Sequence, residues 1–256
     1  MYKELLIWPL LLEGQVVYPP DAREMVAKAC DNFPVDPMIF NRMPDGKLVQ
    51  GSYGTAEEGE GWGIPPQIFF GGGQGLIRIT GLGLDGGDLL GREASTIATA
   101  VGTLLNTPYK FKVNTGQCTV KRSEPKVYWV RALMLSKQKN SMNAFKDKAT
   151  GRFTLASVEP LIRRAVIGGV VSQARFLDEQ CNEPALREQQ IGTDDMLGLT
   201  VLGGEAAVIK AKKDAQVYAL IVNNLVFSID LELKGPWLAG VFRSRGFGLI
   251  RQRIVR

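Results

Sequence analysis

The sequence predicts an α+β protein built from two tandem ferredoxin-like modules, each with the RRM-type element order β-α-β-β-α-β. A chain of 256 residues with 45% hydrophobic residues can form one large domain or two small ones, each with its own core. In the first half, short apolar runs typical of strands alternate with two amphipathic stretches typical of helices. A second series of strand, long helix and strands starts near residue 126. We expect domains at residues 1–122 and 123–256.

The first half contains the signals of one complete module. Pro19 and Pro20 end the first strand, and Asp21 is expected to cap the first helix. The glycine-rich turn between two apolar runs predicts a hairpin. The expected elements are strands over 4–12 and 14–18, a helix over 21–33, a short strand over 38–43, a hairpin over 67–80, a helix over 88–105 and a strand over 109–122.

The second half predicts a decorated module. A strand over 126–137 leads into a basic, helical insertion at about 138–192, and a glycine-rich loop at 235–248 precedes the last strand. Ser157 is expected to cap a helix over 157–180. Its apolar face, at spacings of three and four residues, consists of Val158, Leu161, Ile162, Ala165, Val166 and Val170. Further strands are expected over 206–213, 216–222, 225–234 and 247–255.

Charge is distributed unevenly along the chain. The whole chain has a net charge of +5, but residues 1–100 have −6, residues 121–164 have +8 and residues 232–256 have +5. Two concentrated basic blocks indicate an anionic polymer such as nucleic acid as partner. Ordinary solvated faces combined with an oligomer contact would produce the same pattern.

Several function classes are excluded by residues that the sequence lacks. It contains no histidine, which excludes Ser-His-Asp and Cys-His catalysis and histidine-based zinc sites. Cys30, Cys118 and Cys181 are widely spaced and form no CxxC pair, which favours a reducing, cytoplasmic setting. The apolar run near the N-terminus is short, and no stretch approaches 18 uncharged apolar residues. We therefore expect no signal peptide and no membrane contact.

Two motifs suggest other chemistries. GLGLDG at 81–86 matches the G-x-G-x-x-G dinucleotide fingerprint between a strand and a helix, although Asp85 and Asp88 would repel a pyrophosphate. The acidic clusters that could hold two catalytic metals are Asp194-Asp195 and Glu57, Glu58 and Glu60. A plain strand-to-helix turn and ordinary turn residues are the preferred explanations of the two motifs. We expect no cofactor and no metal.

The C-terminal stretch KGPWLAGVFRSRGFGLIRQRIVR, residues 234–256, combines glycines with arginines. Its glycines would let the main chain approach a ligand closely, and exposed N–H groups there could hold phosphates. Arg243 and Arg245 would add charge-assisted contacts to the same phosphates. The alternative is the tip of a β-hairpin with a bulge.

This loop, LKGPWLAGVFRSRGFGLI, resembles the C-terminal glycine-rich loop of the CRISPR-associated RAMP proteins. Members that mature CRISPR RNA have two tandem ferredoxin-like folds, which is similar to the order of strands and helices expected for this chain. The lack of histidine resembles the divergent processing enzymes of type IV systems, in which arginines occupy the active site. The resemblance implies a metal-independent endoribonuclease that cuts CRISPR repeat RNA beside a stem-loop and stays bound in an effector complex with other subunits.

The resemblance also implies residue roles. The catalytic residues would be Arg23, Arg42, Arg243 and Arg245, with Tyr18 as a possible proton partner. The basic blocks and the loop would contact the RNA through Lys121, Arg122, Lys137, Lys139, Lys146, Lys148, Arg152, Arg163, Arg164, Arg175, Gly240, Ser244, Gly246, Gly248 and Arg251. Two alternatives stay open: a non-catalytic RAMP subunit that grips the RNA handle, and a dinucleotide-dependent enzyme that uses Gly81, Gly83 and Gly86.

Overall fold

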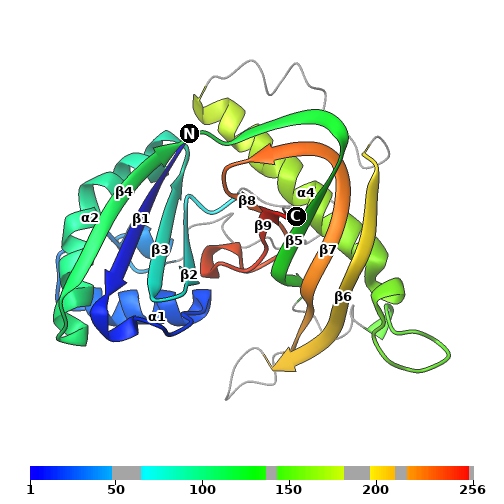
Figure 1. Cartoon of the computed structure of the whole chain (residues 1–256), viewed down its shortest axis with the longest axis horizontal. Helices are drawn as coiled ribbons and strands as arrows, with labels where there is room; N and C mark the ends of the chain where they lie inside the picture. The colour runs from blue at the N-terminus through cyan, green and yellow to red at the C-terminus, as the bar shows by residue number, and fades with distance from the viewer. Residues whose placement is uncertain (48–64, 137–142, 182–196, 211–217, 254–256) are drawn as a thin grey trace.

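The structure is a computed structural model that describes residues 1–47, 65–136, 143–181, 197–210 and 218–253. It contains two antiparallel sheets, each covered by helices, and these lie side by side (Figure 1). The predicted α+β class is confirmed. The described helices provide no segment that is both long enough and apolar enough to cross a membrane.

The first module has the predicted β-α-β-β-α-β order. Its elements are β1 (Tyr2–Pro9), α1 (Pro19–Cys30), β2 (Ile68–Gly73), β3 (Leu76–Leu82), α2 (Gly83–Leu105) and β4 (Tyr109–Gly116). The strand order is β2-β3-β1-β4, and every pair is antiparallel. Figure 1 shows α2 along the outer side of this sheet.

The second module repeats the same strand order. Its elements are β5 (Thr119–Ser136), α4 (Leu155–Cys181), β6 (Leu199–Lys210), β7 (Tyr218–Lys234), β8 (Trp237–Leu238), η4 (Arg243–Arg245) and β9 (Leu249–Gln252). The sheet order is β6-β7-β5-β9-β8. Because α4 connects β5 to β6, it is the first helix of this module and not part of an insertion. The glycine-rich loop with β8 and η4 stands where a second helix would connect β7 to β9.

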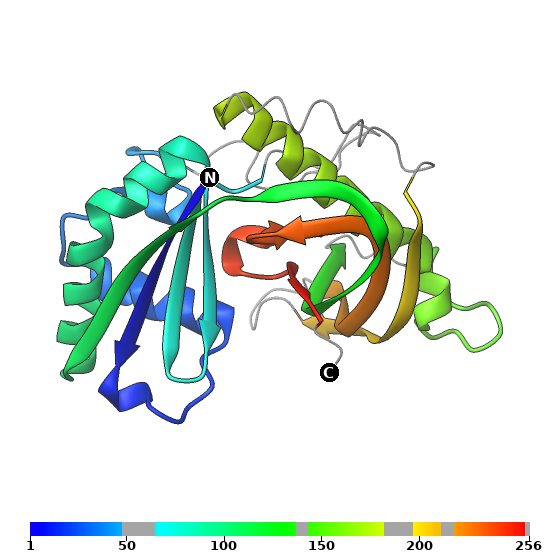
Figure 2. The same cartoon turned by 45° about the horizontal axis from the view of Figure 1, so that its top comes forward.

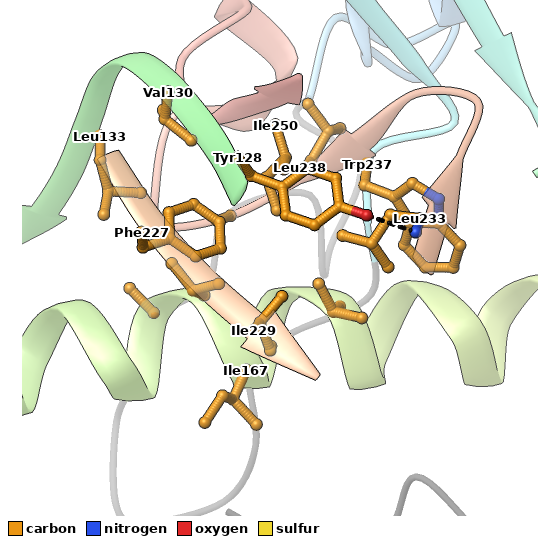
Figure 3. Packing of buried hydrophobic residues seen from close by; sticks show 14 of the residues in the cluster. Tyr128, Val130, Leu133, Ile167, Phe227, Ile229, Leu233, Trp237, Leu238 and Ile250 are labelled. Carbon is orange, nitrogen blue, oxygen red and sulfur yellow. Dashed lines mark hydrogen bonds between the residues drawn. The ribbon is translucent and has the colours of Figure 1, made fainter. Parts of the chain in front are cut away.

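Two large hydrophobic clusters support the sheets. The cluster of the second module packs α4 against β5, β7 and β8 (Figure 3). At its centre the buried Tyr128 hydroxyl donates to the Leu231 carbonyl (3.0 Å) and accepts from the Leu233 N–H (2.8 Å). Phe69 and Leu82 of the first module belong to this second cluster as well. The two modules therefore share apolar packing, which fixes their contact.

Three local expectations are corrected by the structure. Residues 38–43 form no strand, because Pro37–Phe40 is a 3-10 turn that the Asp36 carboxylate caps at the Met38 N–H (2.9 Å). The first helix begins at Pro19 with Tyr18 as N-cap, which places Asp21 inside the first turn. The long helix is capped by Thr154, whose hydroxyl accepts from the Ser157 N–H (3.2 Å).

The strand boundaries also differ from the expected ones. The apolar runs at 216–222 and 225–234 are one strand, β7, in which Asn224 adopts a left-handed conformation with φ of 49°. The chain leaves the first sheet at Gly116 and enters the second at Thr119, slightly before the expected domain boundary at 122. The predicted apolar face of the long helix is buried or half-buried against the sheet.

Candidate active site

The glycine-rich loop lies between the two sheets. Figure 2 shows η4 and β9 (red) in the space between the first module and the curved second sheet. Around η4 the backbone turns sharply, because Phe242 (φ 59°) and Gly246 (φ 81°) both adopt the left-handed conformation. The loop therefore presents η4 to the first module.

Gly246 packs closely against the first module. A Cβ added there would overlap the Phe70 carbonyl oxygen in β2 and the Cβ of Pro19 at the start of α1. Only glycine combines that contact with a positive φ at low cost. The docking of the loop on the first module therefore requires glycine at position 246.

The N–H groups of Gly240, Gly246 and Gly248 are not free for a phosphate, which corrects the expectation for these three loop glycines. Gly246 donates to the Arg243 carbonyl (2.9 Å), Gly248 to the Ala132 carbonyl (2.9 Å) and Gly240 to the Ala165 carbonyl (3.4 Å). These bonds hold the loop in place. Contacts from this loop to RNA would therefore come from its side chains.

The two loop arginines lie in different surroundings. Arg243 is buried, with 3% of its surface exposed, and burial lowers its pKa to about 10. It therefore remains charged at neutral pH and cannot act as a base there. Arg245 is half-buried, and its guanidinium carbon lies 5.2 Å from the centroid of the Phe242 ring. Ser244, between them, is buried as well.

Arg23 lies on the helix that η4 contacts. Its guanidinium carbon is 5.9 Å from the centroid of the Phe70 ring, and the Phe70 carbonyl faces Gly246. Phe70 is thus a shared neighbour of Arg23 and the loop. The structure brings α1 and η4 together.

Arg42 is placed differently from the expectation. It follows the 3-10 turn and not a strand, and its guanidinium donates to the Gly46 carbonyl of its own turn (2.9 Å). It is exposed, and it does not line the pocket described next. A role for Arg42 in the site has no geometric support from these contacts.

A pocket of about 710 Å³ opens beside the loop, between the start of α1, the glycines of β2 and strands β5 and β7. Tyr18 and Arg131 stack across it, with the guanidinium carbon 4.3 Å from the ring centroid. Arg251 lies 5.8 Å from the Trp129 ring on another wall. Asp21 and Glu205 also line the pocket, so its walls have both signs of charge.

Sequence reasoning missed Arg131 and Trp129 as candidates. Both lie in β5, in the run KVYWVRAL, where the alternation of aromatic and basic residues could have indicated one strand face. The contact of Arg131 with Tyr18 depends on the approach of the two modules, which the sequence does not show. Trp129 contacts Arg251 because β5 pairs with β9. The pair of Tyr18 and Arg131 combines an aromatic face with a cation, as sites for nucleotides do.

The remaining basic candidates lie on several faces. Lys121 and Arg122 pair with Glu232 (2.8 Å) and Asp230 (2.9 Å) of β7. Arg163 donates to the Leu199 carbonyl and so fastens α4 to β6, whereas its neighbour Arg164 is exposed. Exposed positions are also occupied by Arg175, Lys146, Lys148 and Arg152.

The loop that contains Lys146, Lys148 and Arg152 projects from the start of α4, away from the first sheet (Figure 1). It is held by the Asp147 carboxylate, which accepts from the N–H groups of Ala149 (2.9 Å) and Thr150 (2.8 Å). These hydrogen bonds lower the pKa of Asp147. This loop is ordered and basic, and it is not adjacent to η4.

The GLGLDG motif lacks the structural context of a dinucleotide site. β3 pairs antiparallel with both neighbours, unlike the parallel strands of a dinucleotide-binding fold. Gly83 and Gly86 already belong to α2, and a Cβ on Gly86 would lie 2.6 Å from the Gln67 carbonyl oxygen. The glycines serve close packing, and the dinucleotide hypothesis is not supported.

Some candidates lie outside the described residues: Lys137, Lys139, Asp194, Asp195, Glu57, Glu58 and Glu60. Within the described ranges, no group of three or more His, Cys, Asp or Glu side chains is arranged to hold a metal ion.

The fold is similar to those of several Cas6-type proteins. It matches the structure of Csf5, described as a CRISPR-Cas type IV Cas6 crRNA endonuclease, with a TM-score of 0.66 and 17% identity over 99% of this chain and 100% of that one. It matches a Cas6b structure with a TM-score of 0.59 and 16% identity over the same shares. A Cas6b described as a CRISPR RNA processing endoribonuclease matches with a TM-score of 0.55, at 14% identity and again over the same shares.

A sequence model of the type IV CRISPR-associated endonuclease Csf5 matches residues 1–254, and the chain therefore belongs to that family. The predicted membership of the RAMP group is confirmed. A comparison with curated protein sequences finds no match.

Proposed function

We propose that this protein cuts CRISPR repeat RNA next to a stem-loop, without a metal ion, and keeps the product bound for an effector complex. The observation that carries the proposal is the docking of η4, with Arg243 and Arg245, against the α1 helix that contains Arg23. That contact brings together the elements that contain these arginines. The neighbouring pocket is lined by Tyr18, Arg131 and Arg251 and not by these three arginines. The family to which the chain belongs supports the same activity.

The proposed chemistry uses the nucleophile that RNA itself contains. The 2′-oxygen attacks the adjacent phosphorus, the bond from phosphorus to the 5′-oxygen breaks, and the products end in a 2′,3′-cyclic phosphate and a 5′-hydroxyl. Negative charge develops on the phosphoryl oxygens, and Arg23, Arg243 and Arg245 would stabilise it. A fixed RNA hairpin would hold the attacking and leaving oxygens in line.

Proton transfer needs a group other than arginine, because a guanidinium stays protonated near neutral pH. The Tyr18 hydroxyl belongs to a residue that lines the pocket and is 47% exposed. It would donate its proton to the leaving 5′-oxygen while water accepts the proton of the attacking 2′-hydroxyl, and the resulting tyrosinate would regain a proton from water. Without a histidine the reaction should be slow and close to a single turnover.

Incubation of the purified protein with labelled repeat-stem RNA in excess EDTA tests this function. We expect cleavage at one position in EDTA, at a rate equal to that in Mg²⁺, because 2′-hydroxyl attack needs no metal. Mapping of the product ends should show the cyclic phosphate and the 5′-hydroxyl. Cleavage that requires Mg²⁺ would contradict the mechanism.

A second function is favoured by the burial of Arg243, at 3% exposure. A side chain so enclosed could serve only to fix the loop in a subunit that grips the RNA handle. Tight binding of the stem RNA with no cleavage in any buffer would select this non-catalytic role.

The basic loop between β5 and α4 would hold the RNA stem at a distance from the cut. Removing one exposed lysine that contacts a phosphate lowers the slope of log K against log salt by about 1. We expect this for Lys146→Ala and for Lys148→Ala, with little change in the cleavage rate at saturating RNA. Filter binding at several salt concentrations measures it.

Lys28→Ala provides a matched control, because Lys28 is equally exposed but lies on α1 and pairs with Glu24 (3.0 Å). Its salt slope should equal that of the wild-type protein. An unchanged slope for both loop variants would remove this loop from the RNA interface.

A further inference from the structure

A second pocket of about 480 Å³ lies between the two modules, next to the candidate active site. Its walls come from the face of the first sheet that is turned toward the second module, and from the ends of β7 and β9. Its polar lining includes Tyr2, Arg78, Thr80, Lys234 and Arg251. Leu249 and Arg251 line both pockets, so the two are neighbours along one cleft.

Positive charge is concentrated around this pocket. Arg78, Lys234 and Arg251 outnumber Glu4, the acidic residue that lines it. Glu4 pairs with Arg78 (3.0 Å), and Lys234 pairs with Glu232 of β7 (3.5 Å). Burial lowers the pKa of Arg251, and the charge of Arg78 lowers it further. Cations that repel one another in the free protein are stabilised when an anion binds between them.

Thr80 adds an unsatisfied polar group to the same wall. It is 1% exposed, and within the described part of the chain its hydroxyl has no hydrogen-bond partner. Thr80 is paired with Glu4 in the sheet register, and its side chain lies on the same face of β3 as Arg78. A buried hydroxyl without a partner costs stability, and a bound oxygen acceptor would remove that cost.

We propose that this pocket binds one phosphate of a single-stranded RNA segment that continues from the cleavage site. Arg78 and Arg251 would contact the phosphate oxygens, and the Thr80 hydroxyl would donate to them. The pocket shares Arg251 with the candidate active site, so a strand leaving the cut would pass it directly. This inference rests on the proposed function, since it gives the RNA its path beyond the stem.

Binding to two RNAs tests the proposal. Both contain the repeat stem-loop with a 2′-deoxy nucleotide at the cut to prevent cleavage, and one has a few unpaired nucleotides on each side. We expect the flanked RNA to bind the wild-type protein about tenfold more tightly, as a charge-assisted contact allows. Thr80→Val and Arg251→Gln should remove most of that gain, and Thr80→Val should leave the melting temperature unchanged or raised.

Thr99→Val is the control, because Thr99 lies on α2 within 3.1 Å of the Tyr109 hydroxyl and outside the pocket. It should retain the full gain in affinity that the unpaired flanks provide.

Equal binding of both RNAs by the wild-type protein would overturn the inference and leave the proposed function standing. Failure to bind the stem RNA at all would overturn the proposed function itself. A third outcome would overturn the assignment to an RNA strand. In that outcome the wild-type protein binds a free mononucleotide, Thr80→Val loses this binding, and the unpaired flanks add no affinity.

Discussion

Replacement of Arg243 by methionine is expected to slow cleavage by about 100-fold, the usual cost of removing one group that stabilises charge in the transition state. Binding of the uncleaved RNA should weaken much less. Burial disfavours the charge of Arg243, as its lowered pKa of about 10 indicates. Methionine has a similar length without that charge.

The difference between the loss in cleavage and the loss in binding makes this variant informative. Single-turnover cleavage and filter binding on the same preparation measure both, and thermal melting measures the stability of the variant. Arg164→Met, at an exposed arginine of α4, is the control and should change neither. A lower melting temperature with equal losses in binding and cleavage would make Arg243 a clamp that only fixes the loop.

Replacement of Gly246 by alanine is expected to have a comparable effect for a different reason. The added Cβ would overlap the Phe70 carbonyl oxygen and Pro19, so η4 would have to move away from the first module. A shift of about 1 Å in a catalytic group can cost about 100-fold in rate. Because the arginines of the loop move together, cleavage should fall by about that factor, and the melting temperature should fall as well.

Gly14→Ala is the control that distinguishes the effect of the steric clash at Gly246 from the effect of backbone strain. Gly14 has a similar φ of 76°, but no atom lies within 4 Å of the position that a Cβ would take. Both variants therefore have the conformational cost of alanine in the left-handed region, about 1–2 kcal/mol. Only Gly246→Ala should lose cleavage. Equal activity of the two variants would show that the docking of the loop on the first module is not needed.

The arrangement of the strands could be predicted from the sequence because it depends on local patterns. The apolar runs around Gly71–Gly75 predicted the β2–β3 hairpin, and the spacing from Val158 to Val170 predicted the buried face of α4. The apolar pattern at residues 38–43 wrongly predicted a strand, because the Asp36 cap and Pro37 favour a 3-10 turn there. Capping and backbone hydrogen bonds compete with apolar periodicity there.

The site could be predicted only in part. Glycines and arginines in the loop pointed to residues 240–248, and α1 does approach them. The burial of Arg243, the stacking of Tyr18 on Arg131 and the unpaired Thr80 hydroxyl all arise where the two modules meet. No local pattern encodes that meeting, because the contacting residues are far apart in the chain.

The most direct test of the proposed mechanism is cleavage of a repeat RNA that has a single 2′-deoxy nucleotide immediately before the cut. The reaction in EDTA should stop completely on this RNA, while the unmodified RNA is cut and both bind with equal affinity. That result would establish the 2′-oxygen as the nucleophile. Cleavage of the 2′-deoxy RNA at the same position would contradict the account, since the attacking oxygen would then have to come from water.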